Sequence, residues 1–264
     1  MMSQVFVSGH KSPDTDSIAA ALSYSYLKRR LGMDAVAVRA GEINKESRFA
    51  LDYFNLEEPI LVTSVERKNP EDEKQKVILV DHNESKQTID GMDDAKVLEI
   101  IDHHRFGDFE SENPIFILVR PVGCVNTVIY GLYKANHIKP SREIAGIMLS
   151  AIISDTVLFR SPTTTEEDKE TAKELAEIAG VDYEAYGMEM LKAGADISDY
   201  PAEKLARNDT KEFSAAGNVF TVGQISVMNV DPINEKKAEI MKVLCSFLSH
   251  GDRYLGGGYI PVVH

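Results

Sequence analysis

Histidine and aspartate residues gather at four places in the first 155 positions of this 264-residue chain. Three of these groups come directly after short apolar runs, and the fourth lies near the end of an apolar helical pattern. The groups are His10, Asp14 and Asp16; Asp81 with His82; Asp102, His103 and His104; and Asp155. Carboxylates so close together repel one another, so the pattern predicts a cation between them.

The residue types in these groups favour a divalent transition metal. Imidazole and carboxylate ligands suit Mn²⁺, Fe²⁺, Co²⁺ or Zn²⁺. Four aspartates and two histidines are too many for one ion with open positions, but they suit two ions that share a bridging carboxylate. Two ions roughly 3.5–4 Å apart polarise phosphoryl oxygens and lower the pKa of a bridging water, so that hydroxide forms at neutral pH. The pattern therefore favours hydrolysis of a phosphoester or a phosphoanhydride.

The elements that would position these residues alternate along the first half of the chain. The predicted strands are residues 4–9, 35–40, 76–83, 96–104 and 114–121, and the predicted helices are 17–32 and 45–55. Asp16 is a candidate N-cap of the first helix. This alternation predicts an α/β fold, a mostly parallel sheet with helices on both faces. Ligands of such sheets bind beyond the carboxyl ends of the strands.

Asp155 is informative because of its helical phase. Steps of three and four residues place it on one face with Ile144, Met148, Ala151 and Ile152. A charge on that apolar face is costly unless it is paired or bound to a metal. A buried aspartate that caps a helix would give the same pattern. The coincidence of several strands that bring Asp or His to one sheet edge favours the metal.

The rest of the chain has a different pattern. From about residue 140 it is helical, with a capping box predicted at 163–166 or 164–167. The polar stretch 195–210 is typical of a hinge or linker. After it, a hairpin that turns at 216–218 and a helix near 233–250 predict a second, smaller α+β unit.

Composition excludes several function classes. The formal charge is 29 − 42 = −13, which counts against a general nucleic-acid binder, because an acidic surface repels a phosphate backbone. We expect no membrane span, since there is no run of about 18 apolar residues, and no secretory signal is visible. Two cysteines do not make a disulfide framework and fit a reducing cytoplasm. The expected substrate is small, and a small anion is compatible with this charge because metal ions in a cleft can invert the local field.

Five motifs carry a resemblance to a known family. "GHKSPDTDS", "LVDHNE", "IDHHR", "PVGCVNT" and "SAIISDT", in this order and spacing, resemble the DHH phosphoesterase superfamily and, within it, family II, the manganese-dependent inorganic pyrophosphatases. The resemblance covers roughly residues 4–240. It implies hydrolysis of pyrophosphate to two phosphates, two Mn²⁺ per chain (with Co²⁺ as a substitute in vitro), Mg²⁺ that accompanies the substrate, and a homodimer.

The resemblance also implies roles for individual residues. One Mn²⁺ would be held by His10, Asp14 and Asp81, and the other by Asp16, Asp81, His103 and Asp155. His104 would face the substrate and assist proton transfer to the leaving phosphate, while Asp102 would orient the ligand histidines. Lys211 would clamp a substrate phosphate; without the resemblance it reads as a surface lysine. Cys124 is expected to be a small buried residue.

The resemblance implies two domains. Residues 1–195 would form the metal-binding catalytic domain, and 196–264 a linker and a C-terminal domain that closes over pyrophosphate. The family's second domain ends near a basic "SRKKQ"-type motif, which these 264 residues lack, and Arg253 has no matching context. We therefore expect this domain to be incomplete, the metals to be retained and pyrophosphate to be hydrolysed poorly. The alternatives are a phosphodiesterase acting on short oligonucleotides or cyclic dinucleotides, and a non-catalytic metal- or nucleotide-sensing relative.

Overall fold

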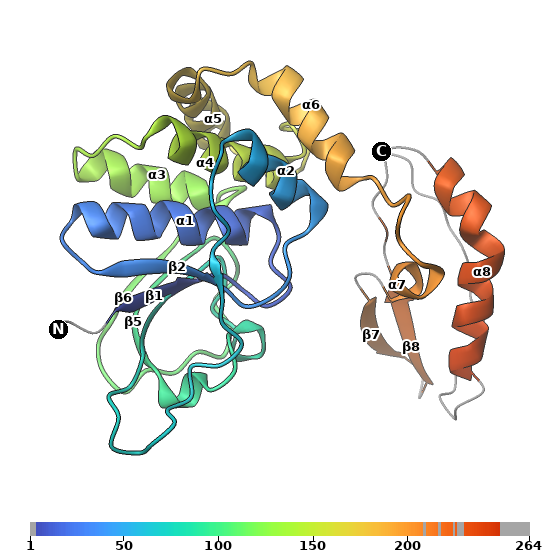
Figure 1. Ribbon diagram of the computed structural model, residues 1–264, viewed down its shortest axis with the longest axis horizontal. Coiled ribbons are helices and arrows are strands. Elements are labelled where there is room, and N and C mark those ends of the chain that lie inside the picture. The colour runs from blue at the N-terminus through green and yellow to red at the C-terminus, as the bar shows by residue number, and fades with distance from the viewer. Residues whose placement is uncertain (1–3, 208–209, 216–217, 224, 226–229, 249–264) are drawn as a thin grey trace. The chain divides into compact units, whose positions relative to one another are not determined.

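A computed structural model describes residues 4–207, 210–215, 218–223, 225 and 230–248, with the backbone alone described for residues 210–215, 218–223 and 246–248. The chain forms two compact units, Met1–Gly194 and Ala195–His264. The sheet, the helices around it and all the clustered His and Asp residues belong to the first unit (Figure 1).

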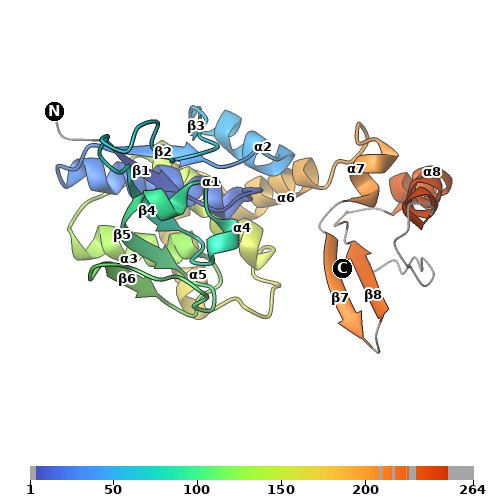
Figure 2. The ribbon, with the colours of Figure 1, turned by 90° about the horizontal axis from the view of Figure 1, so that it is seen from below.

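The first unit is built on a parallel sheet of six strands in the order β3-β2-β1-β4-β5-β6 (Figure 2). In chain order the strands are β1 Val5–Ser8, β2 Ala35–Arg39, β3 Ile60–Leu61, β4 Lys76–Val80, β5 Lys96–Asp102 and β6 Phe116–Val119. The α/β prediction is confirmed, and each of the five predicted strand ranges contains a strand. The unpredicted β3 has two residues, too few to show a period.

α-Helices cover one face of this sheet (Figure 1). They are α1 Thr15–Arg30, α2 Lys45–Tyr53, α3 Val125–Ala135, α4 Arg142–Thr156, α5 Glu166–Ala179 and α6 Tyr183–Gly194. The other face is covered by loops that include two short 3₁₀ helices, η1 Ser85–Gln87 and η2 Met92–Asp94. The prediction of helices on both faces is therefore wrong for the described α-helices of this unit, because the connections after β4 and β5 form loops and 3₁₀ turns instead. Burial on both faces explains why the central strands read as continuous apolar runs, such as the buried Val77–Val80 of β4.

Two predicted helix caps are wrong in detail. The N-cap of α1 is Asp14 rather than Asp16, because the Asp14 side chain accepts a hydrogen bond from the backbone N–H of Ser17. The capping box of α5 is formed by Thr165 and Asp168, one residue beyond the nearer predicted pair. Asp16 therefore does not cap α1, and its side chain is one of the potential metal ligands described below.

The second unit contains α7 Ala202–Ala206, the strands β7 Thr210–Ala215 and β8 Asn218–Gly223, and α8 Asp231–Leu248. The predicted hairpin is confirmed by antiparallel pairing from Thr210↔Gly223 to Ala215↔Asn218, although residues 216 and 217 lie outside the described residues. The stretch 195–210, predicted as a linker, contains α7. Arg253 lies outside the described residues. Among the described helices, none has the length and apolarity needed to cross a bilayer.

Candidate metal centre and active site

The four groups meet at the carboxyl edge of the sheet. His10 follows β1, Asp81 follows β4, and the pair His103 and His104 follows β5. Chain connections leave β1 and β4 toward opposite sides of the sheet, so these neighbouring strands form the switch point at which α/β folds place ligands. Asp155 reaches the same place from the last turn of α4. The predicted convergence is therefore found in the structure.

One set of potential ligands consists of His10, Asp14 and Asp81. His10 Nε2 lies 3.6 Å from Asp14 Oδ2 and 3.4 Å from Asp81 Oδ2. The other ring nitrogen, Nδ1, lies 2.7 Å from the carbonyl oxygen of Lys11 and donates to it. That hydrogen bond fixes the tautomer and leaves Nε2 as the ligand atom.

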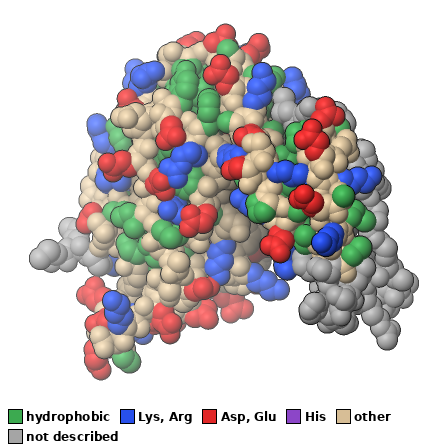
Figure 3. Space-filling model, turned by 45° about the vertical axis from the view of Figure 1, so that its right-hand side comes forward, with side chains coloured by type: hydrophobic (Ala, Val, Ile, Leu, Met, Phe, Trp, Pro, Cys, Tyr) green, Lys and Arg blue, Asp and Glu red, His purple; other side chains and the backbone are tan. Residues whose placement is uncertain are grey.

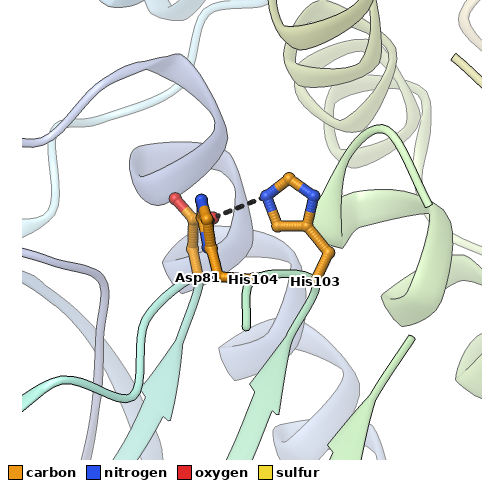
Figure 4. A group of neighbouring side chains, drawn as sticks. All are labelled: Asp81, His103 and His104. Carbon is orange, nitrogen blue, oxygen red and sulfur yellow. Dashed lines mark ion pairs between the residues drawn. The ribbon is translucent and has the colours of Figure 1, made fainter. Parts of the chain in front are cut away.

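The second set consists of Asp16, His103 and Asp155. His103 Nε2 lies 3.6 Å from Asp16 Oδ2, 3.9 Å from Asp155 Oδ2 and 3.3 Å from Asp81 Oδ1. The ring is again held by a backbone carbonyl, since His103 Nδ1 donates to Val122 O at 3.0 Å. Figure 4 shows Asp81 and His103 approaching each other from the ends of β4 and β5.

Asp81 connects the two sets, because it groups with His10 and Asp14 and also, in a third group, with His103 and His104. Its Oδ2 faces His10 and its Oδ1 faces His103, so the two oxygens of one buried carboxylate point to different groups. Its backbone is in the left-handed region, with φ +62°, which aspartate tolerates better than most residues. This conformation comes directly after β4. Asp81 thus has the geometry of a bridging carboxylate.

The electrostatics fit a site that needs cations. Burial, together with the charges of Asp16 and Asp14, raises the pKa of Asp81 to about 6, and burial and the same aspartates raise the pKa of Asp155 well above its usual value. Burial opposes protonation of His10 and His103, but their aspartate partners outweigh it and raise the two pKa values to about 11 and about 10. Protons on the imidazoles therefore supply positive charge that a divalent ion would supply more fully.

The residues present fit divalent metal ions. Asp81 Oδ2 is buried and has no hydrogen-bond partner among the described residues, although its desolvation is costly. The converging atoms are imidazole nitrogens and carboxylate oxygens alone, a set suited to Mn²⁺ and similar ions. The structure brings together all six ligand candidates predicted from the sequence, and it also groups His104 with Asp81 and His103. The six are His10, Asp14, Asp16, Asp81, His103 and Asp155.

His104 has different surroundings from its neighbour. Its Nδ1 lies 2.9 Å from Asp102 Oδ1 and donates to it, which leaves Nε2 available, and the side chain is 54% exposed. The hydrogen bond to Asp102 raises the pKa of His104. His104 also lies near Asp81, with Nδ1 3.8 Å from Asp81 Oδ1, but that nitrogen is already engaged by Asp102.

Asp102 is fully buried and holds this loop together. Its Oδ1 accepts the backbone N–H groups of His103 and His104, and its Oδ2 accepts from Asn83 Nδ2 at 2.6 Å. Burial alone would raise the pKa of Asp102, but the hydrogen bonds from His104 and Asn83 hold it below its usual value. Among the described contacts, Asp102 orients the ring of His104, whereas a carbonyl orients the ring of His103.

The sequence analysis did not predict the hydrogen bonds that hold the carboxylate of Asp16 in place. Asp16 accepts hydrogen bonds from Val125 N at 2.8 Å, Asn126 Nδ2 at 2.7 Å and Cys124 Sγ at 3.0 Å. These donors lie at the start of α3, where the helix dipole also favours a negative charge. Cys124 is buried, as predicted. The motif "PVGCVNT" could have indicated these hydrogen-bond donors, since it predicts a helix N-terminus with polar residues.

His82 was grouped with Asp81 in the sequence, but the structure gives it another position. Its Nδ1 donates to Val80 O at 2.9 Å, and its buried Nε2 has no hydrogen-bond partner among the described residues. Burial lowers the pKa of His82 to about 4, so the ring is neutral. His82 lines a pocket of about 260 Å³ together with Asn83, Glu84, Gln87, His104 and Arg105. The exposed side of His104 thus borders a cavity next to the ligand sets.

Two further features of the sequence concern other parts of the chain. Lys211 lies in β7, where the structure describes the backbone alone, so its predicted contact with a phosphate stays a prediction. On the face shown in Figure 3, acidic side chains are interspersed with basic and hydrophobic ones over the described residues. The acidic composition is therefore distributed over that face.

Two family models match the chain. The "DHH family, N-terminal domain" matches residues 4–152, and the "DHHA2 domain" matches residues 188–255. Among curated relatives, the manganese-dependent inorganic pyrophosphatase of Bacillus subtilis (strain 168) is 46% identical over 243 residues, which cover 92% of this chain and 77% of that protein. A protein of Exiguobacterium sp. named "Probable manganese-dependent inorganic pyrophosphatase" is 49% identical over 239 residues, which cover 90% of this chain and 76% of the relative.

Comparison with solved structures also shows a similarity to the inorganic pyrophosphatases. The crystal structure of a Methanococcus jannaschii "putative family II inorganic pyrophosphatase" has a TM-score of 0.79 and 40% identity, covering 93% of this chain and 80% of that chain. An exopolyphosphatase-related protein from Bacteroides fragilis has a TM-score of 0.54 at 16% identity, covers 83% of this chain and 65% of that chain, and shows the fold alone. With these matches and the geometry of the site, the chain belongs to the DHH family and, within it, to the manganese-dependent inorganic pyrophosphatases.

Proposed function

We propose that this chain hydrolyses inorganic pyrophosphate to two phosphates at a site for two Mn²⁺ ions, and that Mg²⁺ accompanies the substrate. The observation that carries the proposal is the position of Asp81, whose two oxygens face two separate sets of ligands. The names of the relatives support both the substrate and the metal.

The ligand roles in this proposal follow the two sets. His10, Asp14 and Asp81 would hold one ion, and Asp16, Asp81, His103 and Asp155 the other. When bound, such ions supply Lewis acidity toward phosphoryl oxygens and toward a water. The chain's carbonyl oxygens at Lys11 and Val122 keep Nε2 of the two histidines turned toward the site.

His104 is the proposed general acid for the leaving phosphate. Asp102 accepts from its Nδ1, and the raised pKa favours the protonated ring, so that Nε2 carries a proton to donate. Its exposed ring borders the pocket next to the ligand sets, where a substrate oxygen could reach it. Asp102 remains ionised and keeps the ring in position.

The division of labour between the domains is also a proposal. Residues 1–195 would carry the metals, and 196–264 would be a linker and a domain that closes over the substrate, with Lys211 binding a phosphate. The match of the DHHA2 domain to residues 188–255 supports this second part. Lys211 lies in the strand β7, from which its side chain would contact the substrate phosphate in this proposal.

We place the protein in the cytoplasm as a homodimer. Both cysteines are free, which suits a reducing compartment. The edge strand β6 has two exposed apolar residues, Phe116 at 49% and Ile117 at 41%. An exposed apolar edge strand favours pairing with another chain. Light scattering on the purified protein would give the mass, and a monomer at micromolar concentration would contradict the dimer.

A substrate comparison tests the proposed activity. The protein loaded with Mn²⁺ is assayed in parallel with pyrophosphate, a short oligonucleotide and a cyclic dinucleotide, with Mg²⁺ present. We expect phosphate release from pyrophosphate to exceed turnover of the two diesters by several orders of magnitude. Faster cleavage of either diester would identify a phosphodiesterase, and binding of Mn²⁺ without turnover of any substrate would identify a non-catalytic relative.

A further inference from the structure

Glu46, in the first turn of α2, lies outside both ligand sets but is hydrogen-bonded to residues next to them. Its Oε1 accepts from Thr15 Oγ1 at 2.7 Å and from Ser154 Oγ at 2.5 Å. Thr15 stands between the ligand candidates Asp14 and Asp16, and Ser154 directly precedes Asp155. One carboxylate oxygen therefore connects the start of α1 to the end of α4.

The start of α1 carries ligands of both sets, and the end of α4 carries a ligand of the second set. Asp14 belongs with His10, whereas Asp16 and Asp155 belong with His103. Asp16 and Asp155 each bring a carboxylate oxygen to within 4.8 Å of the other, so the two repel each other when both are ionised. Hydroxyl groups that are held by a common acceptor fix the spacing of the two helix ends, on which the distance between these carboxylates depends.

The other side of Glu46 faces the end of α6. A Cβ atom added to Gly194 would lie 2.9 Å from both the Cβ and Oε2 of Glu46, which is closer than real side chains allow. Gly194 is the last residue of α6 and of the first unit. Contacts also join α2 to α4 and α6, so the three helices lie side by side in the helical layer (Figure 1).

We propose that Glu46 is a positioning residue: through Thr15 and Ser154 it sets the spacing of the two metal-binding helix ends, and its own position depends on the close approach of Gly194. The inference rests on the proposed metal-binding function. The described interactions show no hydrogen bond between Glu46 and a ligand side chain, so its role would be indirect. Gly194, the last residue of the first unit, would hold Glu46 in place.

Mn²⁺ binding measures this role directly. Both stoichiometry and dissociation constants are obtained by calorimetry and by electron paramagnetic resonance, without any assay of turnover. Removing the acceptor in Glu46→Ala should weaken Mn²⁺ binding by about tenfold or more, in the range found for residues that orient metal ligands. Glu46→Gln keeps an acceptor oxygen of the same reach, and since burial raises the pKa of Glu46, a neutral amide is tolerated there. We expect Gln to restore affinity to within about threefold of the wild type, because the acceptor is retained.

Glu99→Ala is the matched control for the side chain. The Glu99 side chain is 12% exposed and accepts from two side chains, Tyr24 and Lys28, which are not among the ligand candidates. Its loss should lower the melting temperature and leave Mn²⁺ affinity unchanged. If Glu46→Ala merely loosened the fold, the two variants would affect Mn²⁺ affinity alike, and the proposal would be overturned.

Gly194→Ala tests the second half of the proposal without changing the carboxylate. The added methyl group should displace Glu46 and weaken Mn²⁺ binding in the same direction as Glu46→Ala. Gly131→Ala in α3 is its control, because nothing lies within 4 Å of the added Cβ, and it should bind Mn²⁺ normally. Wild-type affinity in Gly194→Ala would overturn the link to α6.

The wild-type titration separates the failure of this inference from failure of the proposed function. If the wild-type chain bound no Mn²⁺, the metal site itself would be wrong. If the wild type bound two ions and Glu46→Ala bound them equally well, the positioning role alone would be wrong. An equal loss in Gln and Ala variants would show that charge, and not the acceptor geometry, is what matters, and this too would overturn the proposal.

Discussion

At the level of single residues, the site depends on which atoms each side chain leaves free. Asp81 turns one oxygen toward each set of ligands, and its Oδ2 lacks a hydrogen-bond partner among the described residues. His10 and His103 each have Nδ1 occupied by a backbone carbonyl. His104 has Nδ1 occupied by a carboxylate instead. The same side chain is thus prepared for two different tasks by its hydrogen-bond partner.

Asp81→Ala should weaken binding of both Mn²⁺ ions, because the bridging carboxylate would be missing from both sets. We expect the variant to hold fewer than one ion per chain after dialysis, whereas the wild type holds two. Metal analysis of the purified proteins measures this. Asp94→Ala is a control, since Asp94 pairs with Arg67 away from the site. Two ions retained at unchanged affinity in Asp81→Ala would rule out the bridging role.

His103→Gln and His104→Gln should separate metal binding from proton transfer. His103→Gln should lose Mn²⁺ affinity first, because Nε2 is a proposed ligand. His104→Gln should keep two ions but lose turnover by roughly 10²–10⁴-fold, the usual contribution of general acid–base catalysis. Turnover at saturating Mn²⁺ and metal content are measured on both. Equal loss of metal from the two variants would make His104 a ligand and remove its separate role.

At the level of elements, α4 ends in an uncommon backbone conformation next to the site. Val157, Leu158 and Phe159 all have positive φ angles of 48°, 52° and 65°. Left-handed backbone costs L-residues about 1–2 kcal/mol each, and β-branched valine is the least suited to it. Phe159 packs on Tyr183 of α6, and Leu158 lies close to Gly187. Tertiary packing therefore holds a turn that its local sequence disfavours, directly after Asp155.

Val157→Asn should raise the free energy of unfolding of the metal-free protein by about 1 kcal/mol, because asparagine tolerates φ +48° better than valine. Little packing is lost, since Val157 is 44% exposed. Denaturant unfolding measures the change. Leu31→Asn is the matched control: Leu31 caps the C-terminus of α1, is 48% exposed, and has φ −89°. A gain of the same size at Leu31 would show that strain at Val157 is not the cause.

At the level of the whole molecule, the fold concentrates negative charge at one sheet edge and relies on cations to balance it. The chain has a net charge of −13, and the site contains four aspartates in close range. In the metal-free protein, the protons on His10 and His103 provide that balance, which is why their pKa values are raised. Metal ions and protons therefore compete for the same place.

The metal-free protein should lose stability as the pH rises. The raised pKa values of His10, about 11, and His103, about 10, mean that these groups stabilise the fold fully below their unfolded value of about 6.5. This contribution is lost progressively as the pH rises toward the folded values. We expect the melting temperature of the metal-free protein to decrease as the pH is raised from about 6.5 to about 9. The melting temperature of the Mn²⁺-loaded protein should decrease less over the same range. Parallel slopes with and without Mn²⁺ would contradict this coupling.

Much of this protein was determined by its sequence alone. Alternating apolar runs predicted the parallel α/β sheet, because the burial of both faces makes central strands continuously apolar. The clustered Asp and His residues predicted that potential metal ligands converge, because parallel strands deliver their carboxyl ends to one edge. The five motifs predicted the family to which the chain belongs.

Other features were decided only by the tertiary structure. The bridging geometry of Asp81 requires the left-handed backbone after β4 and the positions of two neighbouring loops. Asp16 was expected to cap α1, yet it is held by the start of α3, about 110 residues away in sequence. Glu46 acquires its contacts from α1 and α4 in the same way. Sequence patterns report periodicity and residue type, whereas such long-range hydrogen bonds exist only once the helices have packed on the sheet.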